Sequence, residues 1–515
     1  MSELEALAGS VLCVGVPGAT ADDALLERLR ALRPGGIVLF ARNVARRDAA
    51  RELVRSLQAA LGSELPLSIG IDQEGGRVAR IAVDPPFPAA MGLGAANDVA
   101  LAQRAGEALA TTVAAVGANV GFVPVLDLAL DPRSTVIGTR SLGDDPERVG
   151  TLGAALVRGL QAAGVAATPK HFPGHGATSA DSHVALPVVA TAGRTLRARE
   201  LVPFAAAIAA GARAVMTAHV LVPALDTELP ATLSPRILCD LLRAELGFTG
   251  VCFTDSLEMS AVSAGLGTVR AAMLALRAGA DVLLVSHDLG VAEAVRDGIV
   301  RAVHDGELPA ARLAEAAARV DAFRRAHRPA QTLTRMEEAC VADVARDVAA
   351  RAIAVVRGEL RIAAERPVTI VSFEGASQDG IASSAAQRPS LNLALRRRRV
   401  RSELLRVALD PDGPMIEGLA QVVQAQPTHT LVMLARRAQL HTAQLAAIDA
   451  LLGIVPDARV VSMLEPFDVP AFARARNVAC TFGDEVTNIE ALADALVGRA
   501  AATGRVPVAL EAVAR

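Results

Sequence analysis

Eight short apolar runs, each followed by a helix-like stretch, most constrain the fold of this 515-residue chain. The runs are rich in Val, Ile and Leu and mostly continuous, which is typical of parallel strands covered on both faces. They are Ser10–Val16, Gly36–Phe40, Leu67–Asp72, Asn119–Asp127, Ala166–His171, Ala214–Val220, Val251–Asp255 and Asp281–His287. This alternation predicts an α/β fold with a (β/α)8 TIM-like barrel. An open doubly wound sheet is the alternative, but no glycine-rich dinucleotide fingerprint follows the first run.

The pattern changes near Arg328–Pro329, where a polar stretch replaces the regular alternation. A long amphipathic helix is predicted from Met336 to about Arg357. Strand-like runs then return at Val368–Phe373, Thr430–Leu434, Arg459–Met463 and Asn477–Phe482. We therefore expect a barrel over 1–330, a linker and connecting helix over 331–362, and a smaller αβα sandwich domain over 363–515.

Composition narrows the environment and the partners. The net charge is −3 and the basic run Arg396–Arg399 lacks interleaved aromatics, so we expect no nucleic-acid partner. The five cysteines are widely spaced and form no CxxC pair, which indicates reduced thiols rather than disulfides or a zinc site. Glu3 and Glu5 stand where a signal peptide would be basic, and no apolar run reaches the roughly 20 residues of a membrane span. We expect a cytoplasmic protein without a membrane partner, whose oligomeric state the sequence does not set.

Ionisable residues gather at the C-terminal ends of the predicted strands. In a barrel these ends meet on one face, where active sites lie. The residues are Asp72, Asp127, Lys170, His171, His219, Asp255 and His287. Their shared position predicts an active site on this face.

The segment Lys170–Pro187, KHFPGHGATSADSHVALP, is the richest in chemical groups. If Asp181 accepts a hydrogen bond from one ring nitrogen of His183, the other nitrogen is aimed and its tautomer fixed. A histidine with an ordinary pKa of about 6.5 can give and take a proton near neutrality. We therefore expect Asp181 and His183 to act as an acid/base pair, and His175 only to shape the loop.

A zinc site made by His171, His175 and His183 is the alternative for this loop. The absence of HExxH and the cationic neighbour Lys170 count against it, so we expect no metal.

Two further segments add candidates. Asp255 closes the seventh strand in TDSLEM, where a barrel presents a catalytic carboxylate, with Glu258 as a less favoured candidate. Asp72 in DQEGGRVAR supplies a carboxylate suited to sugar hydroxyls. Arg80 or Arg77 of the same segment, and Arg140 in GTRSLG, supply cations that can hold the carboxylates or donate to the ligand.

The sequence resembles glycoside hydrolase family 3, within it the β-N-acetylglucosaminidase branch. The likeness spans roughly Gly9–Ala326. It is carried by GGIVLFARN, IDQEGGRVAR, FPAAMGLGAA, GFVPVLDL, GTRSLGDDP, KHFPGHG…DSHVALP, MTAHV, PATLSP and LGFTGVCFTDSLEM. The KHFPGHG…DSH loop is highly specific to this branch, and TDSLEM is similar to the family's nucleophile motif.

The resemblance implies a retaining mechanism, with Asp255 as nucleophile and His183, oriented by Asp181, as acid and then base. It also implies that N-acetylglucosamine is bound by five residues and that the substrate is a GlcNAc-containing glycoside, typically a muropeptide from cell-wall turnover. The five residues are Asp72, Arg80, Arg140, Lys170 and His171. His219 is a further candidate for the pocket. The resemblance implies no metal and no organic cofactor.

Three other functions stay open at this point. A phosphorylase of the same family would use phosphate in place of water, and a histidine acid/base does not repel that anion. A β-glucosidase would not need the Asp181–His183 pair. A sugar-sensing binding protein, which is not an enzyme, would need neither Asp255 nor His183.

Overall fold

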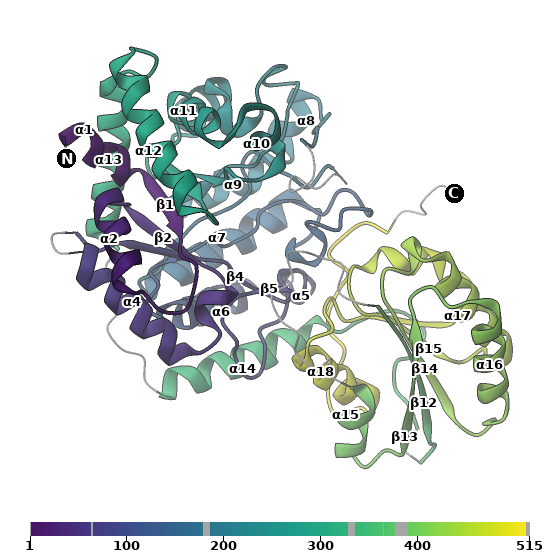
Figure 1. Cartoon of the computed structure of the whole chain (residues 1–515). Helices are drawn as coiled ribbons and strands as arrows, with labels where there is room; N and C mark the ends of the chain where they lie inside the picture. The colour runs from purple at the N-terminus through teal and green to yellow at the C-terminus, as the bar shows by residue number, and fades with distance from the viewer. Residues whose placement is uncertain are drawn as a thin grey trace.

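The computed structural model describes residues 2–62, 65–178, 186–327, 335–363, 365–375 and 390–510. Two bodies are visible, one purple to teal and the other green to yellow, and helix α14 (Arg335–Ala352) runs from the first to the second (Figure 1). In the part of the chain so described, no helix combines the length and the apolar character that crossing a membrane requires.

The first body is a nearly closed barrel of eight parallel strands in the order β7-β6-β3-β2-β1-β10-β9-β8. All eight predicted strands are present; seven are shorter than predicted, and the seventh along the chain is one residue longer. They are β1 (Leu12–Gly15), β2 (Gly36–Leu39), β3 (Ser68–Ile71), β6 (Val120–Gly121), β7 (Ala166–Ala167), β8 (Ala214–Met216), β9 (Val251–Ser256) and β10 (Val282–Val285). A short antiparallel hairpin, β4 (Gln73–Gly75) and β5 (Val78–Ala79), follows β3.

The gap between β7 and β8 is bridged beyond the regular ladders. Phe172 donates its backbone N–H to the Met216 carbonyl at 2.8 Å, and Ala218 donates to the Phe172 carbonyl at 2.7 Å. The Lys170–Phe172 segment is therefore fixed between its neighbours at the C-terminal end of the barrel, although it is not a regular strand.

Helices cover the outside of the barrel, and their apolar faces form one large core with the strands. A smaller interior cluster includes Phe122, Phe253 and, from α13, Phe323. The helices are α1 (Glu3–Ser10), α2 (Asp23–Leu32), α3 (Ala41–Val44), α4 (Arg47–Leu61), α5 (Ala90–Ala96), α6 (Val99–Ala114), η1 (Gly138–Arg140), α7 (Pro146–Ala162), α8 (Gly193–Ala198), α9 (Leu201–Ala209), η2 (Ala231–Leu233), η3 (Arg236–Glu245), α10 (Ser260–Leu266), α11 (Thr268–Ala278), α12 (Leu289–His304) and α13 (Ala310–Ala326).

The second body is a six-stranded sheet with helices on both faces, which confirms the predicted αβα sandwich. The strand order is β11-β16-β15-β14-β12-β13. The strands are β11 (Ala354–Arg357), β12 (Val368–Glu374), β13 (Ser402–Ala408), β14 (Thr430–Ala435), β15 (Arg459–Ser462) and β16 (Asn477–Cys480). Helices α16 (Gly413–Gln424) and α17 (Thr442–Ile454) pack on one face. Helices α14, α15 (Leu391–Arg397) and α18 (Val486–Leu496) pack on the other. The short helices η4 (Ala438–Leu440) and η5 (Pro466–Ala471) complete the body.

The prediction was wrong at the two edges of this sheet. The connecting helix ends at Ala352, and Ala354–Arg357, predicted as its last turn, is strand β11, which pairs antiparallel with β16. Strand β13 was not predicted. Both edge strands are only partly buried, and neither forms a separate apolar run. Ala354–Val356 continues the apolar end of the preceding helix, and Glu403 and Arg406 interrupt β13.

Candidate active site

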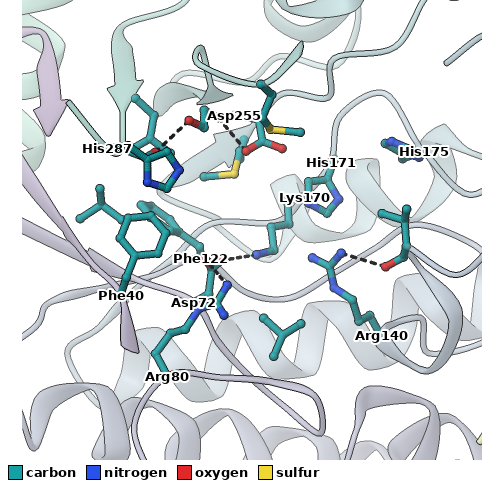
Figure 2. Close-up of a pocket in the computed structure, with 18 residues that line it drawn as sticks. Phe40, Asp72, Arg80, Phe122, Arg140, Lys170, His171, His175, Asp255 and His287 are labelled. Carbon is teal, nitrogen blue, oxygen red and sulfur yellow. Dashed lines mark hydrogen bonds and ion pairs between the residues drawn. The ribbon is translucent and has the colours of Figure 1, made fainter. Parts of the chain in front are cut away.

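The predicted site residues at the strand ends converge on one pocket. Figure 2 shows Asp255 on one side of it and Asp72, Arg80 and Arg140 on the other, with Lys170 and His171 between them. The remaining lining is Val38, Phe40, Val78, Phe122, Val136, His175, Met216, Ser256, Met259, Leu284, Ser286 and His287. The structure thus brings together six of the eight site residues predicted from the sequence.

One wall of the pocket is a cluster of paired charges. Lys170 Nζ lies 2.6 Å from Asp72 Oδ1 and 2.6 Å from Glu74 Oε1. Arg140 binds Glu74 in a bidentate pair, with both nitrogen–oxygen distances at 2.8 Å. Arg80 Nη2 lies 3.6 Å from Asp72 Oδ2. Two carboxylates are therefore held by three cations that come from three separate loops.

Electrostatics keeps these groups ionised. Burial alone would raise the pKa of Asp72, but Lys170 and Arg80 outweigh it and hold the pKa below its ordinary value. Burial is likewise opposed at Glu74, whose pKa is lowered by Arg140 and Lys170. Burial would lower the pKa of Lys170, yet the charges of Asp72 and Glu74 raise it. The wall therefore offers fixed charged acceptors and donors at neutral pH, as a polyhydroxylated ligand requires.

His171 is oriented by Asp127, which follows β6 and is fully buried. Its ring Nδ1 lies 2.6 Å from Asp127 Oδ2, and its backbone N–H also points at the carboxylate. Burial would raise the pKa of Asp127, but His171 lowers it, so the carboxylate is ionised and only accepts. Nδ1 therefore carries the proton, and Nε2 is the ring nitrogen available to a ligand.

His175 belongs to the same arrangement. Its backbone N–H donates to Asp127 Oδ1 at 2.7 Å, and its buried ring lines the pocket. Burial lowers the pKa of the His175 ring, which favours its neutral form. His175 was predicted only to shape the loop. Its backbone contact does so, and its ring also forms part of the pocket wall.

Asp255 lies within the end of β9 and reaches the pocket from the side opposite the charged cluster (Figure 2). Its Oδ1 accepts the Ser256 backbone N–H at 2.7 Å, which stabilises the ionised carboxylate. Glu258, the less favoured candidate, accepts backbone N–H groups at 2.8 Å from His287 and 3.2 Å from Asp288. Those contacts cap the start of α12 and account for Glu258 as a structural residue.

His219 does not line the pocket, in contrast to its prediction as a possible pocket residue. The ring is buried, with Nε2 2.9 Å from the Ser256 carbonyl and Nδ1 2.8 Å from Thr232 Oγ1. It supports the backbone beside Asp255.

Asp181 and His183 lie outside the described residues, so the predicted acid/base pair stays a prediction. The described chain stops at Thr178, three residues after His175 of the pocket wall, and resumes at Leu186. Within the described ranges, no group of three or more His, Cys, Asp or Glu side chains is placed to hold a metal ion.

Glu74 and Asp127 are site residues that the sequence analysis did not assign. Glu74 is two residues after Asp72, a spacing that places both carboxylates on the same side of an extended segment. That spacing could have indicated Glu74 as a site residue from the sequence alone. Asp127 was noted at a strand end, but its pairing with His171 depends on the arrangement of two strands.

Comparison with known proteins identifies the family of the domain that forms this pocket. A model of the glycosyl hydrolase family 3 N-terminal domain matches residues 7–323. The chain belongs to glycosyl hydrolase family 3. This confirms the predicted family, and the chain is a glycoside hydrolase.

Relatives of this family 3 hydrolase match at the level of sequence and of structure. The beta-hexosaminidase of Stenotrophomonas maltophilia (strain K279a) is 42% identical over 292 residues, which cover 55% of this chain and 86% of that protein. A family 3 beta-N-acetylglucosaminidase from Paenibacillus sp. str. FPU-7 superposes over 100% of both chains, with a TM-score of 0.91 and 34% identity. A fungal multi-domain GH3 beta-N-acetylglucosaminidase matches 99% of this chain and 61% of its own, with a TM-score of 0.89 and 27% identity.

Proposed function

We propose that this family 3 glycoside hydrolase is a retaining exo-β-N-acetylglucosaminidase that removes terminal β-linked N-acetylglucosamine. Its relatives support a β-hexosaminidase, one by its name and two solved structures by their titles. The observation that carries the proposal is the position of Asp255 across one pocket from the Asp72–Lys170–Arg140 cluster.

The charged wall is suited to hold the sugar in the −1 subsite. Asp72 accepts hydrogen bonds from sugar hydroxyls, while Lys170 and Arg80 keep its carboxylate ionised. Arg140 supplies donors from the same side, and His171 Nε2 supplies an acceptor, because the ring proton is on Nδ1. Because these groups are already paired with one another, binding requires little rearrangement of the protein.

The first chemical step breaks the glycosidic bond. Asp255 attacks the anomeric carbon and forms a covalent glycosyl ester, while His183 gives its proton to the departing oxygen. In the second step His183 takes a proton from water, and the water oxygen attacks the anomeric carbon. The Asp255 carboxylate leaves, and the sugar is released with its original β configuration.

The predicted role of His183 departs from the common pair of carboxylates in glycosidases. Asp181 would orient the imidazole and stabilise its protonated form, as a carboxylate does for other catalytic histidines. We further propose that the natural substrate is a muropeptide from peptidoglycan turnover and that the enzyme acts in the cytoplasm without a metal or cofactor.

Proton NMR of the products tests the proposal. With an aryl N-acetyl-β-glucosaminide, the first free sugar formed should be the β anomer. The α anomer appearing first would contradict the retaining mechanism. Faster turnover of the matching aryl β-glucoside would indicate a β-glucosidase instead.

The same reaction run in phosphate and in a non-phosphate buffer separates hydrolysis from phosphorolysis. Hydrolysis predicts free N-acetylglucosamine in both buffers. A sugar 1-phosphate formed in phosphate buffer would identify a phosphorylase. Binding of N-acetylglucosamine without any turnover would indicate a sugar sensor.

A further inference from the structure

The loop that carries Arg140 has little regular structure of its own. Between Asp131 and Gly143 its one helical element is the three-residue η1 turn, Gly138–Arg140. Arg140 is nevertheless buried, and its guanidinium contacts Glu74 and the Val136 carbonyl, the latter at 3.1 Å. Because helix or sheet hydrogen bonds do not hold this loop, contacts from outside it must fix Arg140.

Arg77 supplies one set of these contacts. It lies in the β4–β5 hairpin, which also carries Glu74. Its Nη2 donates to the Val136 carbonyl at 2.9 Å and to the Ile137 carbonyl at 3.3 Å, and it also contacts the Thr135 carbonyl. One guanidinium thus holds the three residues that lead into the η1 turn.

Glu465, which belongs to the second domain, lies against the same turn. Its side chain is 4% exposed, and Arg437 pairs with both carboxylate oxygens at 3.0 and 3.1 Å. A Cβ placed on Gly138 would be 2.1 Å from Glu465 Oε1, so the carboxylate rests directly on the turn. Gly138 also has a φ of +45°, which a side chain at this position would disfavour.

The charges at this contact are complementary. Burial would raise the pKa of Glu465, but Arg437 and then Arg77 lower it. The second domain therefore presents a buried anion to Arg77, the cation that holds the Arg140 loop. The sequence alone does not predict this contact, because Glu465 lies far beyond residues 7–323, which the family model matches.

We propose that Glu465 is a positioning residue for the −1 subsite, holding Arg77 and the Gly138 turn so that Arg140 stays on Glu74. The second domain then completes the sugar site of the barrel rather than serving only as an attached module. This inference rests on the proposed function in assigning Arg140 to the sugar, but the placement of the loop is independent of it.

The test compares Glu465→Gln, Arg77→Ala and the double variant in the full-length chain. Arg351→Gln is the matched control, because it removes the 2.8 Å ion pair between α14 and Asp98 without touching the Arg140 loop. Glu465→Gln should raise KM for an aryl N-acetyl-β-glucosaminide, and Ki for N-acetylglucosamine, on the order of tenfold. kcat should stay within about threefold of the wild type, because Asp255 is untouched.

The double variant shows whether Glu465 acts through Arg77. KM for Glu465→Gln/Arg77→Ala should rise by less than the product of the two single effects, because both residues hold the same loop, whereas fully multiplied effects would contradict the proposed route. An unchanged KM and Ki in Glu465→Gln would overturn the proposal, as would an equal rise in the Arg351→Gln control.

Hydrogen exchange of the peptide covering residues 134–143 gives a readout that does not depend on activity. Glu465→Gln should speed exchange in this peptide, and Arg351→Gln should not. If the wild type fails to turn over the glucosaminide, the proposed function fails, while the exchange result still decides the positioning role. Unchanged exchange in Glu465→Gln would end the proposal whatever the activity.

Discussion

Buried carboxylates have opposite environments in the barrel pocket and in the second domain. Glu74 in the pocket is paired with Lys170 and Arg140, which lower its pKa. Asp468 in the second domain accepts hydrogen bonds from two uncharged donors, the Gln439 backbone N–H and the Ser462 hydroxyl, and burial raises its pKa to about 7. Burial and the neighbouring Asp484 raise the pKa of Glu485 to about 8.

The contrast shows where charge is maintained for binding and where it is avoided. Glu465 shows the same contrast within one short segment. It lies three positions before Asp468, yet it pairs with Arg437 and faces the barrel. The two carboxylates held in their charged form here, Glu74 and Glu465, lie in the wall of the pocket and against the loop that supports it. The two with raised pKa values do not line the pocket and lie in the domain without assigned chemistry.

The largest expected effect follows removal of the carboxylate opposite the charged wall. Asp255→Ala should abolish turnover of an aryl N-acetyl-β-glucosaminide, because no group is left to form the glycosyl ester. Binding of N-acetylglucosamine should persist, since Lys170 and Asp72 are unchanged. Steady-state kinetics and calorimetric binding check this, and near-normal turnover would contradict the assignment.

His183→Ala should lower kcat by roughly 10²–10⁴-fold, the range typical of a general acid–base group. A substrate with a very good leaving group needs less protonation, so its first step should be partly restored. Pre-steady-state release of the aryl group measures that step. No restoration, with the fold intact by circular dichroism, would argue against acid catalysis by His183.

A matched pair of substitutions tests the contrast between the two kinds of carboxylate. Glu74→Gln should lower the free energy of unfolding by about 3–5 kcal/mol, because Arg140 stays buried without its carboxylate partner and Lys170 keeps only Asp72. Asp468→Asn at pH 6 should cost less than about 1 kcal/mol, because a neutral group replaces a protonated one. Denaturant unfolding measures both, and equal costs would remove the distinction.

The smallest effect is a pH dependence of stability. Asp468 and Glu485 have raised pKa values in the folded state, so the folded protein binds more protons than the unfolded chain between about pH 4 and pH 8. Their contribution is therefore fully present at low pH and is lost as the pH rises through about 7 to 8. Thermal unfolding of Asp468→Asn/Glu485→Gln should show a flatter fall in Tm over this range than the wild type. Parallel curves would contradict the raised values.

The sequence allowed the barrel and much of its site to be predicted, because both depend on local patterns. Continuous apolar runs mark buried parallel strands, and the residues at their ends share one face. The apolar residues of edge strand β11 continue directly from the preceding helix, and polar residues interrupt edge strand β13, so neither was marked in this way. Pairings such as Lys170 with Asp72, 98 residues apart, and the contact of Glu465 with the Gly138 turn depend on how distant segments pack.

Covalent trapping of the glycosyl-enzyme is the strongest test of Asp255 as the nucleophile. A fluorinated N-acetylglucosaminide that forms the glycosyl-enzyme faster than water cleaves it should label the protein once, and peptide mapping should locate the label. The label should lie on Asp255, within the peptide that contains Thr254 and Ser256. A label on another residue, or inactivation without any covalent sugar, would contradict this assignment.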